Sequence, residues 1–167
     1  MSSSPETSRS AIALNSLESI RNFVALTPEI GTAGQPRRDQ FTLIAAANYQ
    51  SVINLAMPGH ADSIADEGSL VTGLGMNYFH LPVPFEAPSP DHLHQFCQLL
   101  SAQRGRRLFV HCIMNYRVSA FMYHYLRRVM GYSERQARSP ILETWQMEPQ
   151  WRAIMDLDVS TLDLNRD

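Results

Sequence analysis

The sequence predicts an α/β fold with a central, mostly parallel β-sheet and helices on both of its faces. Short segments rich in β-branched and aromatic residues alternate along the chain with segments in which apolar residues recur at helical spacing. The chain has 167 residues, 44% of them apolar and 18% charged, which matches one globular domain. We expect this domain to span residues 11–167, and the Ser-rich residues 1–10 to form a disordered tail.

Four segments are predicted strands, because each is a short apolar run bounded by turn residues. They are residues 30–36, which run into a turn, and residues 51–57, 77–83 and 107–112. Residues 84–90 contain three prolines and are therefore predicted to be a loop.

Helical periodicity fills most of the chain between these strands. It predicts helices over residues 11–26, 38–49, 61–74, 91–103 and 117–130, with a short helix capped by Ser133 and a last helix over 140–157. Asp91 is the expected N-cap of the helix that it begins, and Gly131 is expected to end the helix over 117–130.

The composition excludes several classes of function. The net charge is −2, so no overall positive field favours a nucleic-acid partner. All 14 basic residues are Arg, which excludes lysine Schiff-base chemistry and a P-loop lysine. No apolar stretch approaches the ~20 residues that span a membrane, and the first residues do not match a secretion signal. With only two cysteines, the chain is expected in the cytoplasm with reduced thiols.

One strand–loop–helix junction contains residues suited to chemistry on anions. A predicted strand ends at Cys112, and a helix begins near Arg117. The first turn of a helix presents unpaired N–H groups and a partial positive charge, which stabilise a bound anion or a thiolate. The Arg117 guanidinium can contact two oxygens of an oxyanion at once. So short a loop needs a residue that tolerates positive φ, and Asn115 is the suitable one.

At these residues the chain resembles cysteine-dependent protein tyrosine phosphatases of the dual-specificity type. Their signature is H-C-x5-R-[ST] between a strand and a helix. The chain is most similar to a bacterial phosphatase-like family, some members of which are fused to β-lactamase-hydrolase-like domains. The resemblance covers about residues 30–155. It depends on Gly34-Gln35-Pro36 with the strand over 52–55, on residues 79–84, and on Val110-His111-Cys112 with Arg117.

The resemblance implies a cysteine-phosphatase fold and hydrolysis of a phosphate monoester or related oxyanion, without a metal or organic cofactor. Cys112 would attack phosphorus and form a phosphocysteine, and Arg117 would hold the phosphate oxygens. His111 would tune the thiolate without touching the substrate. The same oxygens would be bound by the N–H groups of Ile113, Met114, Asn115, Tyr116, Arg117 and Val118.

The spacing departs from the dual-specificity signature. Four residues separate Cys112 from Arg117 instead of five, which removes one N–H donor. Four is also the spacing in many rhodanese-type sulfurtransferases, which carry a persulfide on cysteine, so this activity is an alternative. Ser119 lies two positions after Arg117 and is expected either to bond the thiolate or to lie on the helix face. Asn54, a polar residue inside a strand, is expected to brace the phosphate loop.

The second departure concerns the acid that protonates the leaving group. Phe85 stands near the place of the family's aspartate, and the nearest carboxylates are Glu86 and Asp91. Glu86 is the better candidate, because Asp91 is the expected helix cap. If neither carboxylate reaches the site, general acid catalysis worth ~10²–10⁴ in rate is missing. The protein would then be a weak enzyme or a non-catalytic module that binds phosphate or a phosphoprotein.

Overall fold

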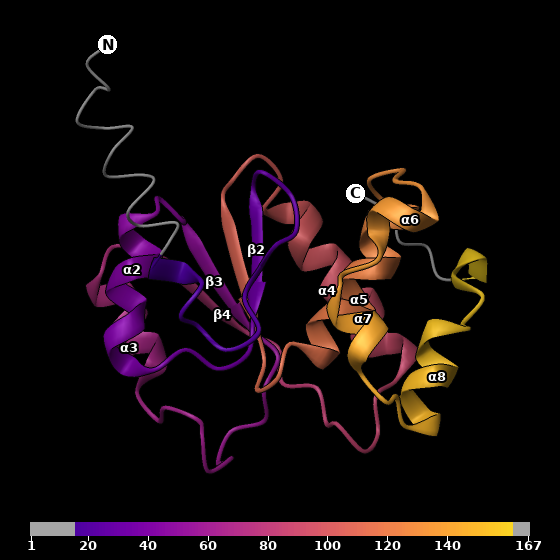
Figure 1. Ribbon diagram of the computed structural model, residues 1–167, viewed down its shortest axis with the longest axis horizontal. Helices are drawn as coiled ribbons and strands as arrows, with labels where there is room; N and C mark the ends of the chain where they lie inside the picture. The colour runs from indigo at the N-terminus through magenta and orange to yellow at the C-terminus, as the bar shows by residue number, and fades with distance from the viewer. Residues whose placement is uncertain (1–15, 162–167) are drawn as a thin grey trace.

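The computed structural model describes residues 16–161, so the predicted tail of residues 1–10 lies outside the described part. Its centre is a five-stranded sheet of order β1-β2-β5-β3-β4 (Figure 1). Strands β2, β5, β3 and β4 are parallel, and β1 pairs antiparallel with β2 at one edge. This confirms the predicted mostly parallel sheet. The strands are β1 (Val24–Ala25), β2 (Ile30–Ala33), β3 (Ser51–Asn54), β4 (Asn77–His80) and β5 (Leu108–His111).

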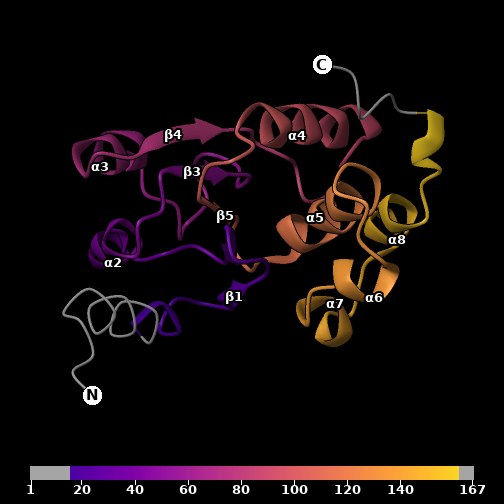
Figure 2. The same cartoon turned by 90° about the horizontal axis from the view of Figure 1, so that it is seen from above.

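Helices cover both faces of the sheet, as Figures 1 and 2 show. One face is covered by α2 (Phe41–Ala46), which follows the 3-10 turn η1 (Arg38–Gln40), and by α3 (Glu67–Gly73). The other face is covered by α4 (Pro90–Ala102), α5 (Tyr116–Arg128), α6 (Glu134–Ala137), α7 (Ile141–Thr144) and α8 (Pro149–Met155). The 3-10 turn η2 (Val159–Thr161) ends the described chain.

The pleat of the central strands separates two apolar cores. Val52 and Phe109 are partners in the β3–β5 register, and both are fully buried in the core beneath α2 and α3. The next pair, Ile53 and Val110, is buried in the larger core with α4 and α5. Because successive side chains of a strand point to opposite faces, two apolar residues in a row bury both sides of a central strand.

Four predicted helices differ in the structure. The helix over 61–74 begins only at Glu67, as α3. The helix over 11–26 does not extend through its described part, because Asn22 has a φ of 51° and Val24–Ala25 joins the sheet. The helix over 91–103 begins at Pro90, with Ser89 as N-cap, so the prediction that Asp91 is the cap is wrong. The helix over 140–157 is two helices, because Pro149 lacks the N–H that a continuous helix needs and instead begins α8.

The parallel strands all end at one edge of the sheet, and the loops that follow them meet there. In open α/β sheets this edge is where ligands bind. Between residues 16 and 161, no helix combines the length and the apolar character that crossing a bilayer requires.

Candidate active site

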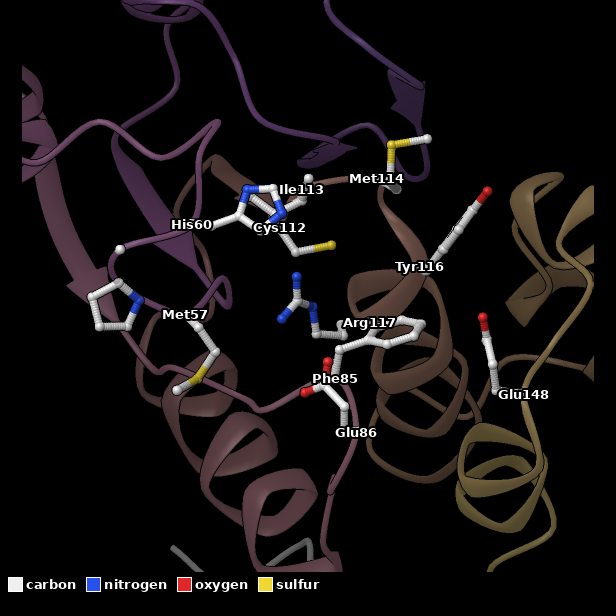
Figure 3. Close-up of a pocket in the computed structure, with 12 residues that line it drawn as sticks. Met57, His60, Phe85, Glu86, Cys112, Ile113, Met114, Tyr116, Arg117 and Glu148 are labelled. Atoms are coloured by element: carbon white, nitrogen blue, oxygen red, sulfur yellow. The ribbon is translucent and has the colours of Figure 1, made fainter.

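A cavity of about 530 Å³ opens where the parallel strands end (Figure 3). Its walls come from the loops after three strands and from the residue before α8. They are Met57, Pro58, Gly59 and His60 after β3; Phe85 and Glu86 after β4; Cys112, Ile113, Met114, Tyr116 and Arg117 after β5; and Glu148. The topology therefore brings Glu86, Cys112 and Arg117 to one cavity.

The carbonyl groups between β5 and α5 are all bonded to the surrounding scaffold. Each carbonyl oxygen of residues 111–115 accepts a hydrogen bond from a group that does not point into the cavity. The partners are Leu55 N for His111 (2.9 Å), His111 Nδ1 for Cys112 (3.0 Å), Gln35 N for Ile113 (2.9 Å), Asn22 Nδ2 for Met114 (2.9 Å) and Ser119 N for Asn115 (3.1 Å).

Most amide groups of the same loop are unpaired. Within residues 16–161, no hydrogen bond is found for the N–H groups of residues 113, 114 and 116–118, while an antiparallel bridge between Gly34 and Met114 pairs the loop with the segment after β2. Residues 116–118 form the first turn of α5, where the partial positive charge of the helix is greatest. A loop whose carbonyls are all bonded and whose amides are mostly free is suited to bind an anion.

Asn115 allows the loop to turn so sharply. Its φ is 69°, in the left-handed region, which confirms the conformation predicted for this position. Its side chain donates to the Asn22 carbonyl over 2.8 Å and to the Thr32 hydroxyl over 3.1 Å. The left-handed conformation is therefore held by the turn before β1 and by β2, as well as by the residue's own tolerance.

The Cys112 thiol and the Arg117 guanidinium lie toward each other at the floor of the cavity (Figure 3). Arg117 is only 6% exposed, and its Nη1 donates to the Val83 carbonyl over 2.9 Å. Its Nε has no partner, and no carboxylate among residues 16–161 forms an ion pair with it. An arginine is always charged, and a buried charge without a counter-charge is costly. The guanidinium is therefore suited to pair with an anion in the cavity.

Two carboxylates line the cavity, and Asp91 is not one of them. Glu86 lies beside Arg117 in Figure 3. Glu148 stands on the side of α8, where its Oε2 accepts from Trp145 Nε1 over 3.1 Å. Asp91 is exposed and instead accepts from Gln95 over 2.6 Å. Of the two acids predicted from the sequence, only Glu86 lines the cavity. The sequence did not indicate Glu148.

Two predicted supporting residues have other partners. The Ser119 hydroxyl donates to Asn115 Oδ1 over 3.2 Å, so it supports the loop and does not bond the thiol. Asn54 does not brace the phosphate loop directly. Its Oδ1 accepts from Ala56 N over 2.8 Å, and its Nδ2 donates to the Tyr78 hydroxyl over 3.0 Å. Asn54 thus fixes the turn after β3, which leads to Met57 at the cavity wall.

A buried carboxylate behind the loop was missed in the sequence. Glu67 is 2% exposed, and its Oε2 lies 2.9 Å from Nε2 of His111. No sequence signal marks it, since an acidic residue in the first turn of a helix is ordinary. No group of three or more His, Cys, Asp or Glu side chains suited to a metal ion occurs in the part of the chain described.

No family model matches the sequence, and no curated protein matches it either. Among solved structures, a DUF442 protein of Shewanella putrefaciens CN-32, a proposed phosphatase, is 31% identical with a TM-score of 0.77. The match covers 85% of this chain and 93% of that one. The chain belongs to the DUF442 family. This agrees with the bacterial phosphatase-like resemblance of the sequence.

More distant structures have the same fold as this DUF442 member. A cysteine-to-serine variant of TpbA from P. aeruginosa, in complex with phosphotyrosine, is 18% identical with a TM-score of 0.65. That match covers 86% of this chain and 88% of TpbA. Kinase-associated phosphatase, with its catalytic cysteine replaced by serine, is 12% identical over 79% of this chain and 89% of its own, with a TM-score of 0.64. The DUF442 chain therefore has the cysteine-phosphatase fold.

Proposed function

We propose that the protein is a cysteine-dependent phosphatase that hydrolyses a phosphate monoester through a phosphocysteine intermediate. One observation supports this most directly: the Cys112 thiol shares a cavity floor with the buried Arg117 guanidinium, whose Nε has no partner, and with the loop amides at the start of α5. A nucleophile inside an anion site is the minimum that displacement at phosphorus requires. Membership of the DUF442 family supports the same activity.

In the first step, the Cys112 thiolate attacks phosphorus while the bond from phosphorus to the ester oxygen breaks. Glu86, protonated at that moment, gives its proton to the departing oxygen. The loop amides and Arg117 hold the other three phosphate oxygens as their charge redistributes. In the second step, water attacks phosphorus and gives a proton to the Glu86 carboxylate, and the thiolate departs. Inorganic phosphate and the alcohol are the products, and no cofactor takes part.

The side chains that line the cavity favour a substrate whose phosphate is attached to an apolar group. Met57 and Met114 are two of the three large hydrophobic side chains that are exposed within the described chain, and both line this cavity. Phe85 and Tyr116 add aromatic surface. Arg117 is the only arginine in the lining, and Glu86 and Glu148 are both acidic. We infer a singly phosphorylated substrate, and TpbA provides a structural relative in complex with phosphotyrosine.

We also infer a reducing compartment such as the cytoplasm, because a thiolate nucleophile must stay reduced. Cys97 and Cys112 are both free thiols, which agrees with this inference. The burial of Cys97 in the core raises its pKa to about 12, so it remains a thiol at neutral pH and does not compete as a nucleophile.

The test compares the wild-type protein with Cys112→Ser on p-nitrophenyl phosphate, with a metal chelator present. We expect turnover by the wild type and none by the variant, while calorimetry shows that the variant still binds inorganic phosphate or tungstate. Acid quench of the wild type during turnover should leave phosphate on the Cys112 peptide. Equal rates for the two proteins would refute the mechanism. Thiocyanate formed from thiosulfate and cyanide would instead support a sulfurtransferase, and phosphate binding without any turnover would indicate a non-catalytic module.

A further inference from the structure

A closed network of polar side chains lies directly behind the nucleophile loop. Glu67, the first residue of α3, accepts from Gln35 Nε2 over 2.7 Å and lies 2.9 Å from His111 Nε2. The Tyr78 hydroxyl also bonds the Glu67 carboxylate, and it accepts in turn from Asn54 Nδ2 over 3.0 Å. Glu67, His111 and Gln35 are all buried, so water does not substitute for these bonds.

The geometry determines where the protons of His111 lie. Its Nδ1 is 3.0 Å from the Cys112 carbonyl oxygen, which can only accept, so Nδ1 carries a proton. Its Nε2 faces the Glu67 carboxylate. Burial by itself raises the pKa of Glu67, but the charge of His111 and the hydrogen bonds from His111, Gln35 and Tyr78 outweigh burial and lower it. Glu67 is therefore ionised at neutral pH, and Nε2 donates to it. Each ring nitrogen of His111 therefore faces an oxygen that can accept a hydrogen bond.

Few other charged groups lie near Glu67 and His111. The edge of the Phe41 ring from α2 packs against the imidazole, with the ring centroids 6.3 Å apart. Tyr78 from β4 and Asn54 from β3 complete the contacts on the sheet side. Asp66, the neighbour of Glu67, is exposed and pairs with Arg38 at the surface. Within residues 16–161, Tyr78 is the other titratable side chain that bonds Glu67, and His111 contacts Cys112 through its main-chain carbonyl.

We propose that Glu67 is a positioning residue for the nucleophile: by keeping His111 doubly protonated, it fixes the Cys112 carbonyl away from the anion site and places a positive charge beside the Cys112 thiolate. The proposal rests on the proposed function only in taking Cys112 as the nucleophile. The family resemblance implies a tuning role for His111 alone. The structure adds a carboxylate that stands 44 residues earlier in the chain.

A role in stability alone accounts poorly for this arrangement. Taking a carboxylate and an imidazolium out of water is costly, and a buried ion pair is often no more stable than apolar residues of similar size. Glu67 shares α3 with the buried Val71, so an apolar side chain could fill its place in the core. The only other contact that the imidazole makes through a ring nitrogen is the one to the Cys112 carbonyl.

The test measures the reactivity of Cys112 in the full chain, without requiring turnover. Alkylation by iodoacetamide is followed from pH 4 to 9 by mass spectrometry of the Cys112 peptide. Glu67→Gln keeps the size of the side chain and one acceptor oxygen but removes its charge. We expect the midpoint of alkylation to move up by about one pH unit, since loss of one nearby charge has an effect of this order. Asp66→Asn, which removes a carboxylate at the adjacent exposed position, should leave the midpoint unchanged.

A midpoint that is the same in Glu67→Gln and in the wild type would overturn the proposal. If Glu67→Gln does not fold, ¹⁵N NMR of the wild-type chain decides. Both imidazole nitrogens of His111 should give the shifts of protonated nitrogen from pH 6 to 8, and an unprotonated nitrogen in that range would refute the proposal. Both readouts are independent of hydrolysis. Failure of Cys112→Ser to abolish turnover would therefore refute the proposed function without affecting this result.

Discussion

The indole Nε1 of Trp151 donates a hydrogen bond to the main-chain carbonyl of Phe85, over 2.8 Å. Two residues earlier in the same segment, the Val83 carbonyl accepts from Arg117. The Arg117 guanidinium also lies over the Phe85 ring, 5.6 Å from its centroid. The segment before Glu86 is thus fixed from both α5 and α8. Helices α5 and α8 therefore hold the segment that carries the candidate acid at the cavity of the candidate nucleophile.

Replacing Trp151 with Phe should loosen this segment while keeping an aromatic ring in the core. Loss of this bond leaves the Phe85 carbonyl with only the longer bond from Gln150 Nε2, over 3.4 Å. We expect hydrolysis of an alkyl phosphate to slow about ten-fold more than hydrolysis of p-nitrophenyl phosphate, because only the poor leaving group needs a well-placed acid. Trp145→Phe is the matched control, since its indole bonds Glu148 and not the loop. Equal slowing of both substrates in Trp151→Phe would contradict this role.

Glu86→Gln removes the proposed acid without changing the size of the side chain. We expect alkyl phosphate hydrolysis to fall by about 10²-fold or more, and p-nitrophenyl phosphate hydrolysis much less, because general acid catalysis contributes ~10²–10⁴. Glu148→Gln is the control, because that carboxylate lines the same cavity. If only Glu148→Gln shows this leaving-group pattern, the acid is Glu148.

The charges of the cavity predict discrimination among phosphate esters. Arg117 is the only arginine in the lining, and Glu86 and Glu148 repel additional negative groups. We expect kcat/KM for phenyl phosphate to exceed that for an inositol bisphosphate or a nucleoside triphosphate by at least about ten-fold, since like charges in contact oppose binding. Steady-state kinetics at fixed ionic strength provides the measurement. Faster hydrolysis of the inositol bisphosphate or the nucleoside triphosphate would refute the inference of a singly phosphorylated substrate.

Two substitutions at Asn115 separate its backbone role from its side-chain role. Glycine tolerates the φ of 69° but loses the bonds to Asn22, Thr32 and Ser119. We expect Asn115→Gly to lower the free energy of unfolding by about 1–3 kcal/mol, since each lost hydrogen bond contributes about 0.5–1.5 kcal/mol. Asn115→Ala should cost about 1 kcal/mol more, because alanine is strained at positive φ. Urea unfolding monitored by fluorescence measures both, and an Ala variant as stable as the Gly variant would show that φ imposes no strain.

His124 should make the protein less stable in mild acid. It is buried in α5, with Nε2 2.7 Å from the Ile154 carbonyl, and burial lowers its pKa below 6.5. The unfolded chain therefore binds a proton at a higher pH than the folded chain does. Stability is complete above pH 6.5 and falls as the pH drops below it. His124→Gln keeps a donor for Ile154 and should flatten Tm between pH 7.5 and 5. If Tm falls with pH as steeply in His124→Gln as in the wild type, groups other than His124 cause the loss of stability.

The lowered pKa of Glu67 acts in the same direction at more acid pH. A carboxylate whose pKa is lowered in the fold stabilises the protein above the ordinary value of 4.5 and loses that contribution as the pH falls. His124→Gln should therefore still lose stability below about pH 4.5, which separates the two effects in one titration of Tm.

Local patterns in the sequence were sufficient to predict the four parallel strands and the loop between Cys112 and Arg117. Strand propensity, turn residues and the start of a helix all depend on a few neighbouring residues. The positive φ of Asn115 was predicted for the same reason, because so short a loop admits few conformations. Helix ends were less predictable: Ser89 caps α4 in place of Asp91, since the cap depends on which hydroxyl or carboxylate reaches the free N–H groups.

Only the tertiary structure showed that Glu67 stands behind His111 and that Trp151 bonds the loop before Glu86. These partners lie 44 and 66 residues apart in the chain. Their contact follows from the order of the strands and the packing of α3 and α8 on opposite faces of the sheet. The sequence alone located the candidate anion site after β5, because that site is built from consecutive residues. The side chains that orient it come from distant elements, and only packing decides which of those reach it.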